Sequence, residues 1–147
     1  MPHKKPTSGP GTLAIRRHAL HQTATLLRRL AYDAGRASKS NAVDSVHDLR
    51  VSIRRLAQCM QVFGQYFPRG KTKKIHATLK QILDLASEVR NRDVAAALLA
   101  KAHVAPDSEL ALLLARERRE ASRLLTVALK HWARRNSYRK WRSRLEL

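Results

Sequence analysis

The chain has 147 residues, the length of a single domain that can bury a sizeable core. Its apolar content of 44% argues against intrinsic disorder, although 28% of its residues are charged. Lys and Arg number 30 against 11 acids, so a formal net charge of +19 makes polyanions the expected partners. A membrane span, a secretory signal and an internal disulfide are not expected, because no apolar run is long enough and Cys59 is the only cysteine. A cytoplasmic location is therefore expected.

Prolines and glycines divide the chain into a short tail and a series of long helices. Residues 1–11 hold three prolines and two glycines, which predicts a flexible basic tail. From about residue 12 to 36, Leu and Ala recur mostly at steps of three and four residues, as in an amphipathic helix. A turn is then expected over residues 37–42, with Ser40 or Asn41 as the N-cap of the next helix.

The strongest periodicity belongs to the second predicted helix. Its apolar residues follow steps of 3, 4, 3, 4, 3 and 4, and they are Val46, Leu49, Ile53, Leu56, Met60, Phe63 and Phe67. Pro68 and Gly70 end this helix. A third helix is predicted over residues 71–101, and a fourth runs from an Asp107 or Ser108 N-cap to about residue 135.

Both of these later helices have apolar faces. The third has Ile75, Leu79, Ile82, Ala86 and Val89, and the fourth has Leu110, Leu113, Leu114, Ala121, Leu124, Leu125, Ala128 and Trp132. Residues 137–147 are expected to form a short fifth helical piece, and no alternating stretch supports a strand. The predicted fold class is therefore all-α, an antiparallel four-helix bundle over residues 12–147 with a short C-terminal helical extension.

Cations line up along each predicted helix. On the second helix, His47, Arg50 and Arg54 share a face with Gln58 beside the apolar residues, while Arg55 points about 100° away from Arg54. Comparable rows are Arg17, His21 and Arg28 on the first helix, Lys73, His76, Lys80 and Ser87 on the third, and Arg116, Arg119, Arg123, Lys130 and Arg134 on the fourth. Like charges at these spacings destabilise a helix, so a shared multivalent anion is the explanation that we favour.

Other features have a plainer explanation. The stretch 121–145 contains eight Lys or Arg and no acid, and the choice between a solvated face and a binding face stays open for Arg134, Arg135, Lys140, Arg142 and Arg144. Cys59 is expected to act as a small core residue, and Trp132 and Trp141 as packing residues. A metal site made from His18, His21 and His47 is not expected, because no carboxylate cluster accompanies them.

The stretch Val46–Leu56, VHDLRVSIRRL, resembles the signature of the CHAD domain (conserved histidine α-helical domain), His-x-x-Arg-Val-x-x-Arg-Arg-Leu. A second CHAD motif, roughly Leu-Gly-x-x-Arg-Asp-x-Asp-Val, is similar to residues 86–94, where Arg90, Asp93 and Val94 match. Ser87 replaces its glycine and Asn91 its first aspartate. Residues 137–139 are also similar to the family's next element, so the resemblance extends over about residues 12–147.

This resemblance implies a helical bundle that binds inorganic polyphosphate through a basic channel, without an established reaction of its own. CHAD proteins typically have two such bundles in tandem, whereas this chain is long enough for one. The chain is therefore expected either to pair with a second copy, as a homodimer that is weak alone and stronger with polyphosphate between the two basic faces, or to bind polyphosphate on an open basic face. Association with polyphosphate granules is also expected. The second motif adds Arg90 to the binding residues, with Asp93 expected to orient Arg90 through a salt bridge.

Two other classes of function remain as alternatives. A general RNA- or DNA-binding protein would use the same phosphate contacts, although seven aromatic residues supply few platforms for base stacking. A histidine phosphotransfer bundle would place Lys-Gly three and four residues after the histidine, where Arg50 and Val51 stand. No glycine-rich phosphate loop, catalytic carboxylate pair or Cys–His dyad is visible, so we expect a non-enzymatic binding protein without cofactor or metal.

Overall fold

The structure is a computed structural model that describes residues 9–147. Its elements are α1 (Pro10–Lys39), α2 (Val43–Val62), the short 3₁₀ helix η1 (Gly64–Tyr66), α3 (Lys71–Lys101), α4 (Glu109–Arg134) and α5 (Ser137–Leu145). No strand occurs within this described part of the chain, so the all-α class is confirmed. None of its helices is long and apolar enough to cross a membrane.

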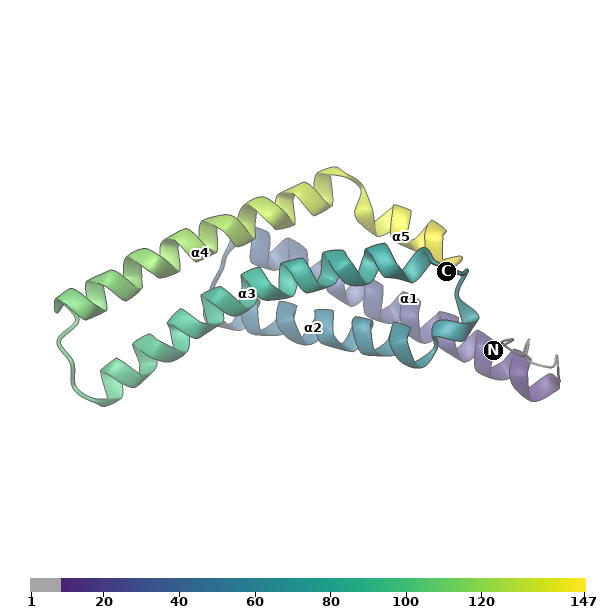
Figure 1. Cartoon of the computed structure of the whole chain (residues 1–147), viewed down its shortest axis with the longest axis horizontal. Helices are drawn as coiled ribbons and strands as arrows, with labels where there is room; N and C mark the ends of the chain where they lie inside the picture. The colour runs from purple at the N-terminus through teal and green to yellow at the C-terminus, as the bar shows by residue number, and fades with distance from the viewer. Residues whose placement is uncertain (1–8) are drawn as a thin grey trace.

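The four long helices form an antiparallel bundle (Figure 1). In this bundle α1 packs against α2, α2 against α3, α3 against α4, and α4 against α1. The short α5 turns back and packs on α1, α3 and α4. The bundle places α2 between α1 and α3, which gives α2 one flank toward each neighbour.

The core follows the predicted periodicity most closely in α2 and α3. All predicted apolar positions of α3, and those of α2 apart from the half-buried Phe63, are buried, and Cys59 is buried beside them. In α4 the buried residues lie in the C-terminal half and are Ala121, Leu125, Leu129 and Trp132. Trp132 and Trp141 pack edge to face with ring centroids 5.4 Å apart, as expected of packing residues.

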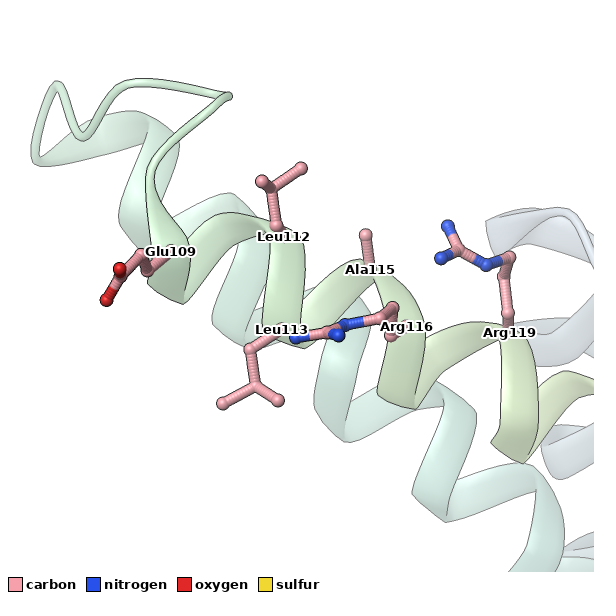
Figure 2. Close-up of a pocket in the computed structure, with 6 residues that line it drawn as sticks. All are labelled: Glu109, Leu112, Leu113, Ala115, Arg116 and Arg119. Carbon is pink, nitrogen blue, oxygen red and sulfur yellow. The ribbon is translucent and has the colours of Figure 1, made fainter.

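Three residues predicted for the core of α4 are instead exposed, two in its first half and Leu124 in its second half. Leu110, Leu113 and Leu124 are 51%, 44% and 42% exposed. The first two lie on the distal hairpin (residues 94–115), where α3 and α4 extend together past the ends of α1 and α2 (Figure 1). Leu112 and Leu113 project away from α4 there in different directions (Figure 2). The prediction of a core position was wrong because no third helix reaches this hairpin.

Several predicted boundaries need correction. Residues 1–8 of the predicted tail lie outside the described residues, but Pro10 and Gly11 already belong to α1. Pro is favoured at the first helical position, because its fixed φ suits a helix and its missing N–H is not needed. At its other end α1 continues through the predicted turn to Lys39, because Ala37 is buried in the core. The second helix ends at Val62, and η1 then carries the chain to the buried Phe67.

The helix caps agree with prediction in α4 and differ in α2. Ser108 is the N-cap of α4, and its Oγ accepts a hydrogen bond from the Ala111 N–H at 3.2 Å. The N-cap of α2 is Ala42, with no side-chain cap bond, in place of Ser40 or Asn41. The Asn41 amide donates instead to α4, to the Ser122 carbonyl at 2.9 Å and the Thr126 hydroxyl at 2.8 Å. A tertiary contact has therefore replaced the expected local one.

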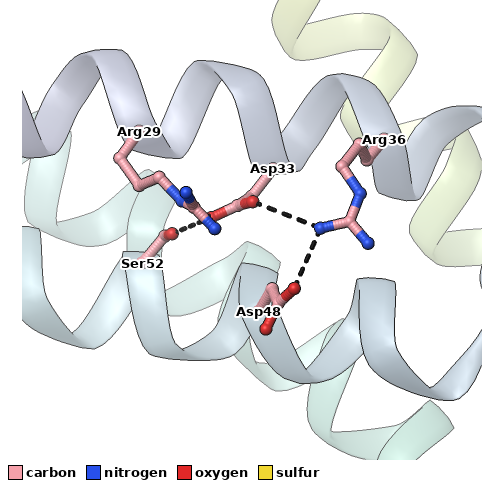
Figure 3. A network of polar contacts seen from close by, with 5 residues as sticks. All are labelled: Arg29, Asp33, Arg36, Asp48 and Ser52. Atoms are coloured by element: carbon pink, nitrogen blue, oxygen red, sulfur yellow. Dashed lines mark hydrogen bonds and ion pairs between the residues drawn. The ribbon is translucent and has the colours of Figure 1, made fainter.

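A polar network centred on the buried Asp33 joins the α1 flank of α2 to α1 (Figure 3). Asp33 of α1 is 1% exposed and accepts hydrogen bonds from Arg29 Nε at 3.0 Å and from the Ser52 hydroxyl of α2. Arg36 lies 3.8 Å from the other Asp33 oxygen and donates to Asp48 Oδ2 of α2 at 2.9 Å. This hydrogen bond is the main reason that the pKa of Arg36 is raised. The network fixes the rotation of α2 and so the direction of its other flank.

Candidate anion-binding site

The flank of α2 that faces α3 carries the predicted row His47, Arg50 and Arg54. His47 and Arg54 are exposed, while Arg50 is half-buried. Arg50 Nε donates a hydrogen bond to Ser87 Oγ of α3 at 3.3 Å, which sets the register of the two helices at this point. The predicted face of α2 therefore borders α3 at Arg50, while His47 and Arg54 remain exposed.

Arg90 of α3 extends the same positive region. Burial and the positive charges of Arg54 and Arg90 together lower the pKa of Arg50 from its ordinary value, with burial the larger cause. Arg54 and Arg90 therefore each lie within range of a Coulomb repulsion with Arg50. The three residues form a cluster that an anion would stabilise.

Carboxylates do not neutralise this cluster. In the part of the chain that the structure describes, Arg50, Arg54 and Arg90 make no ion pair with any acid. The acids nearest to them in sequence are paired elsewhere: Asp48 with Arg36, Glu88 with Arg92, and Asp93 with Arg118. The predicted salt bridge between Asp93 and Arg90 is wrong, because Arg118 Nε of α4 lies 2.7 Å from Asp93 Oδ1.

The remaining predicted residues of α3 continue the row toward its N-terminus. His76, Lys80, Ser87 and Arg90 are spaced by four, seven and three residues, which keeps them on one flank of the helix. Lys73 lies about one turn further along and is exposed. Lys80 pairs with Asp84 at 3.5 Å, with both side chains exposed. We call the set the α2/α3 stripe; its members are His47, Arg50, Arg54, Lys73, His76, Lys80, Ser87 and Arg90.

The predicted cations of α1 and α4 do not join the α2/α3 stripe. Arg17, His21 and Arg28 are exposed on the side of α1 opposite its buried residues. Arg116 and Arg119 lie on the outer side of α4, in a shallow hollow lined only by residues of α4 (Figure 2). Arg123 is held by Glu120 through contacts of 2.7 and 3.0 Å, which raise the pKa of Arg123 and lower that of Glu120. The predicted rows of cations on the different helices therefore do not come together on one surface.

Arg55 points in a different direction from Arg54, as expected from their separation of about 100°, and lies beside α1. It lines a shallow groove of about 400 Å³ between α1 and α2, together with Gln22, Leu26, Gln58, Cys59, Val62 and Phe63. Gln58, which was expected beside Arg54, therefore borders the α1 groove. Within residues 9–147, no group of three or more His, Cys, Asp or Glu lies close enough together to hold a metal ion.

Comparison with known proteins agrees with this helical arrangement. The CHAD domain family model matches residues 18–147, which is nearly the whole chain. No curated protein and no solved structure matches this chain. The family match includes both the α2 signature and the α3 motif whose arginines meet in the α2/α3 stripe. The chain belongs to the CHAD domain family, which is associated with polyphosphate binding.

Proposed function

We propose that this protein binds inorganic polyphosphate along the α2/α3 stripe and does not catalyse a reaction on it. The observation that carries the proposal is the cluster of Arg50, Arg54 and Arg90, three guanidinium groups without a carboxylate partner in the described chain. Guanidinium groups bind phosphate oxygens through paired hydrogen bonds, which suits them to a chain of phosphates.

The shape of the stripe favours an elongated anion. From Lys73 to Arg90, α3 rises roughly 25 Å at ~1.5 Å per residue. Cations recur along this segment of α3. Beside the C-terminal part of the segment, α2 adds His47, Arg50 and Arg54. A single phosphate would contact only one end of the stripe, whereas a linear polyphosphate contacts several turns at once.

Binding should weaken steeply with salt, because each phosphate contact releases counterions. For about six contacts the affinity should fall by orders of magnitude between low and moderate salt. The decisive measurement is competition: bound, labelled long-chain polyphosphate is challenged with RNA, DNA and phosphate at matched charge. Polyphosphate should remain bound, whereas displacement by RNA or DNA at equal charge would support the nucleic-acid alternative.

Two matched double variants locate the site. Arg50→Gln with Arg54→Gln should weaken polyphosphate binding by at least about 100-fold, because each charge-assisted contact contributes roughly 1.5–3 kcal/mol. Arg134→Gln with Arg139→Gln removes the same charge from exposed positions outside the stripe and should have a small effect. Equal losses in the two variants would instead indicate a diffuse electrostatic film. Circular dichroism checks that both variants keep their helices.

The absence of catalysis is tested separately. The protein is incubated with polyphosphate and a nucleotide, with and without divalent metal, and free phosphate is measured. We expect no release and no transfer. Phosphohistidine at His47 after exposure to a phosphodonor would contradict this part of the proposal and favour the phosphotransfer alternative.

A further inference from the structure

A basic cleft lies on the other flank of α3, away from the α2/α3 stripe. After α4, the short α5 turns back and packs beside α3 and α4 (Figure 1). The cleft has a volume of about 720 Å³ and is lined by residues of α3, α4 and α5. Its α3 residues, which include Lys74, Thr78 and Gln81, are a different set from those of the stripe. The two surfaces are therefore separate sites on one helix.

Every ionisable residue that lines this cleft is basic. The cations that line it are Lys74 of α3, His131 of α4, Arg135 at the α4 C-cap, and Lys140 and Arg144 of α5. No acid lines the cleft, and none of these five side chains forms an ion pair within the described residues. Three separate elements thus direct unpaired positive charge toward one opening, which favours an anionic ligand.

Apolar residues line part of this cleft, beside the polar side chains of Thr78, Gln81 and Ser137. Leu124 and Val127, which line it together with Ala77 of α3, are 42% and 56% exposed. The two tryptophans line the same cleft, and the buried indole N–H of Trp132 has no hydrogen-bond acceptor. A buried donor without an acceptor is unfavourable, so this indole N–H lowers the stability of the free protein.

We infer that this cleft binds a nucleoside phosphate, with the base between the apolar walls and the phosphates on the basic rim. A cleft of this volume is in the usual range for a small ligand. Inorganic polyphosphate has no apolar part and would leave Leu124 and Val127 in water. A nucleoside phosphate combines a flat apolar body with several negative charges, and so it complements both parts of the cleft. The inference is independent of the proposed polyphosphate site.

Tryptophan emission reports this site alone. Both tryptophans of the chain line the cleft, and none lies on the α2/α3 stripe. The full chain is titrated with ATP and, separately, with inorganic tripolyphosphate, with excitation at the red edge of the indole band. A saturable change with ATP is expected, at an affinity about tenfold or more above that for tripolyphosphate. Equal affinities would overturn the role of the apolar walls, and unchanged emission with ATP would overturn the inference.

Substitutions then test which basic and which apolar residues of the cleft contact the nucleotide. Lys140→Gln with Arg144→Gln should weaken ATP binding about tenfold or more by calorimetry, while Arg134→Gln with Arg139→Gln, an adjacent pair outside the cleft, should not. Leu124→Ser, at an already exposed position, should weaken ATP binding and leave tripolyphosphate binding unchanged. Arg50→Gln with Arg54→Gln should leave ATP binding unchanged. Loss of ATP binding in that last variant, or equal losses in the two charge pairs, would place the nucleotide elsewhere and overturn the inference.

Discussion

Arg50 is the residue at which folding and anion binding make opposite demands. Its side chain is half-buried against Ser87, and the charges of Arg54 and Arg90 destabilise its charged form. Its position on a cationic row could be predicted from the spacing in the sequence. The partnership with Arg90 needed the register of α2 against α3, which spacing within one helix does not contain.

Removal of one like charge should therefore stabilise the free protein. Arg54→Gln is expected to add about 0.3–0.5 kcal/mol of stability, or about 1 °C in melting temperature, at low salt. The same substitution should weaken polyphosphate binding. Calorimetric melts at low and high salt measure the effect, which should disappear at high salt. Arg134→Gln is the control, and a lower melting temperature for Arg54→Gln alone would contradict the repulsion argument.

Asp33 was not predicted as a buried residue, although the sequence contains a signal for it. It is the first acid of the chain, with Arg29 four residues before it and Arg36 three residues after it. That spacing predicts a paired carboxylate on one helix. Two hydrogen bonds join this region of α1 to α2: Ser52 donates to Asp33, and Arg36 donates to Asp48. Both depend on tertiary packing and could not be inferred from the sequence of α1 alone.

Loss of this carboxylate should destabilise the fold strongly. Asp33→Ala removes the acceptor for Arg29 and Ser52 and is expected to lower the free energy of unfolding by about 2–3 kcal/mol. Asp84→Ala breaks an exposed pair with Lys80 and should change it by less than about 1 kcal/mol. Urea unfolding at neutral pH compares the two. Similar values would mean that the Asp33 network contributes no more than a surface ion pair.

At the level of the elements, the periodicity of apolar residues correctly predicted the buried face of a helix where that helix packs along its whole length. The apolar rows of α2 and α3 predicted their buried faces because each has neighbours on both flanks. The same argument failed for Leu110 and Leu113, since a helix pattern does not reveal how far its neighbours extend. It also failed at the α1–α2 connection, where Asn41 bonds to α4 instead of capping α2.

Asn41 should stabilise the bundle although it caps no helix. Its side chain bonds to α4, and its carbonyl accepts a hydrogen bond from Arg118 Nη2 at 2.5 Å. Asn41→Ala is expected to cost about 1–2 kcal/mol of unfolding free energy. The neighbouring Ser40→Ala, at an exposed position, is the control and should change little. If denaturant melts gave the two variants the same midpoint, the contact with α4 would carry no net stability.

At the level of the whole molecule, the distal hairpin differs from the rest in charge as well as in exposure. Its residues 94–115 include one lysine against two acids, in a chain of formal charge +19. Leu110, Leu112 and Leu113 are about half exposed there, although a helix that is apolar on all sides is normally buried. Two copies of this chain can approach each other through this hairpin, whose formal charge is −1, without the repulsion that the basic faces impose.

Self-association through the hairpin is therefore expected. Sedimentation should detect a dimer that persists at high salt, because its contacts are apolar. Leu98→Glu with Leu112→Glu should shift it to monomer, whereas Leu13→Glu with Val62→Glu, at comparably exposed positions elsewhere, should not. A short polyphosphate should strengthen association by reducing the net charge. A monomer under every condition would show that the hairpin leucines do not mediate self-association.

The separation of the cationic rows has a consequence for long polyanions. The α2/α3 stripe, the exposed cations of α1 and α4, and the cleft rim are formed by different residues on different elements or flanks. A polyanion that extends past one of these surfaces can engage a second molecule, so each protein acts as a multivalent cross-linker. Long-chain polyphosphate near charge balance should therefore produce a turbid, salt-soluble network, while chains no longer than the stripe should leave the solution clear. Light scattering distinguishes the two, and turbidity independent of chain length would point to simple charge neutralisation as its cause.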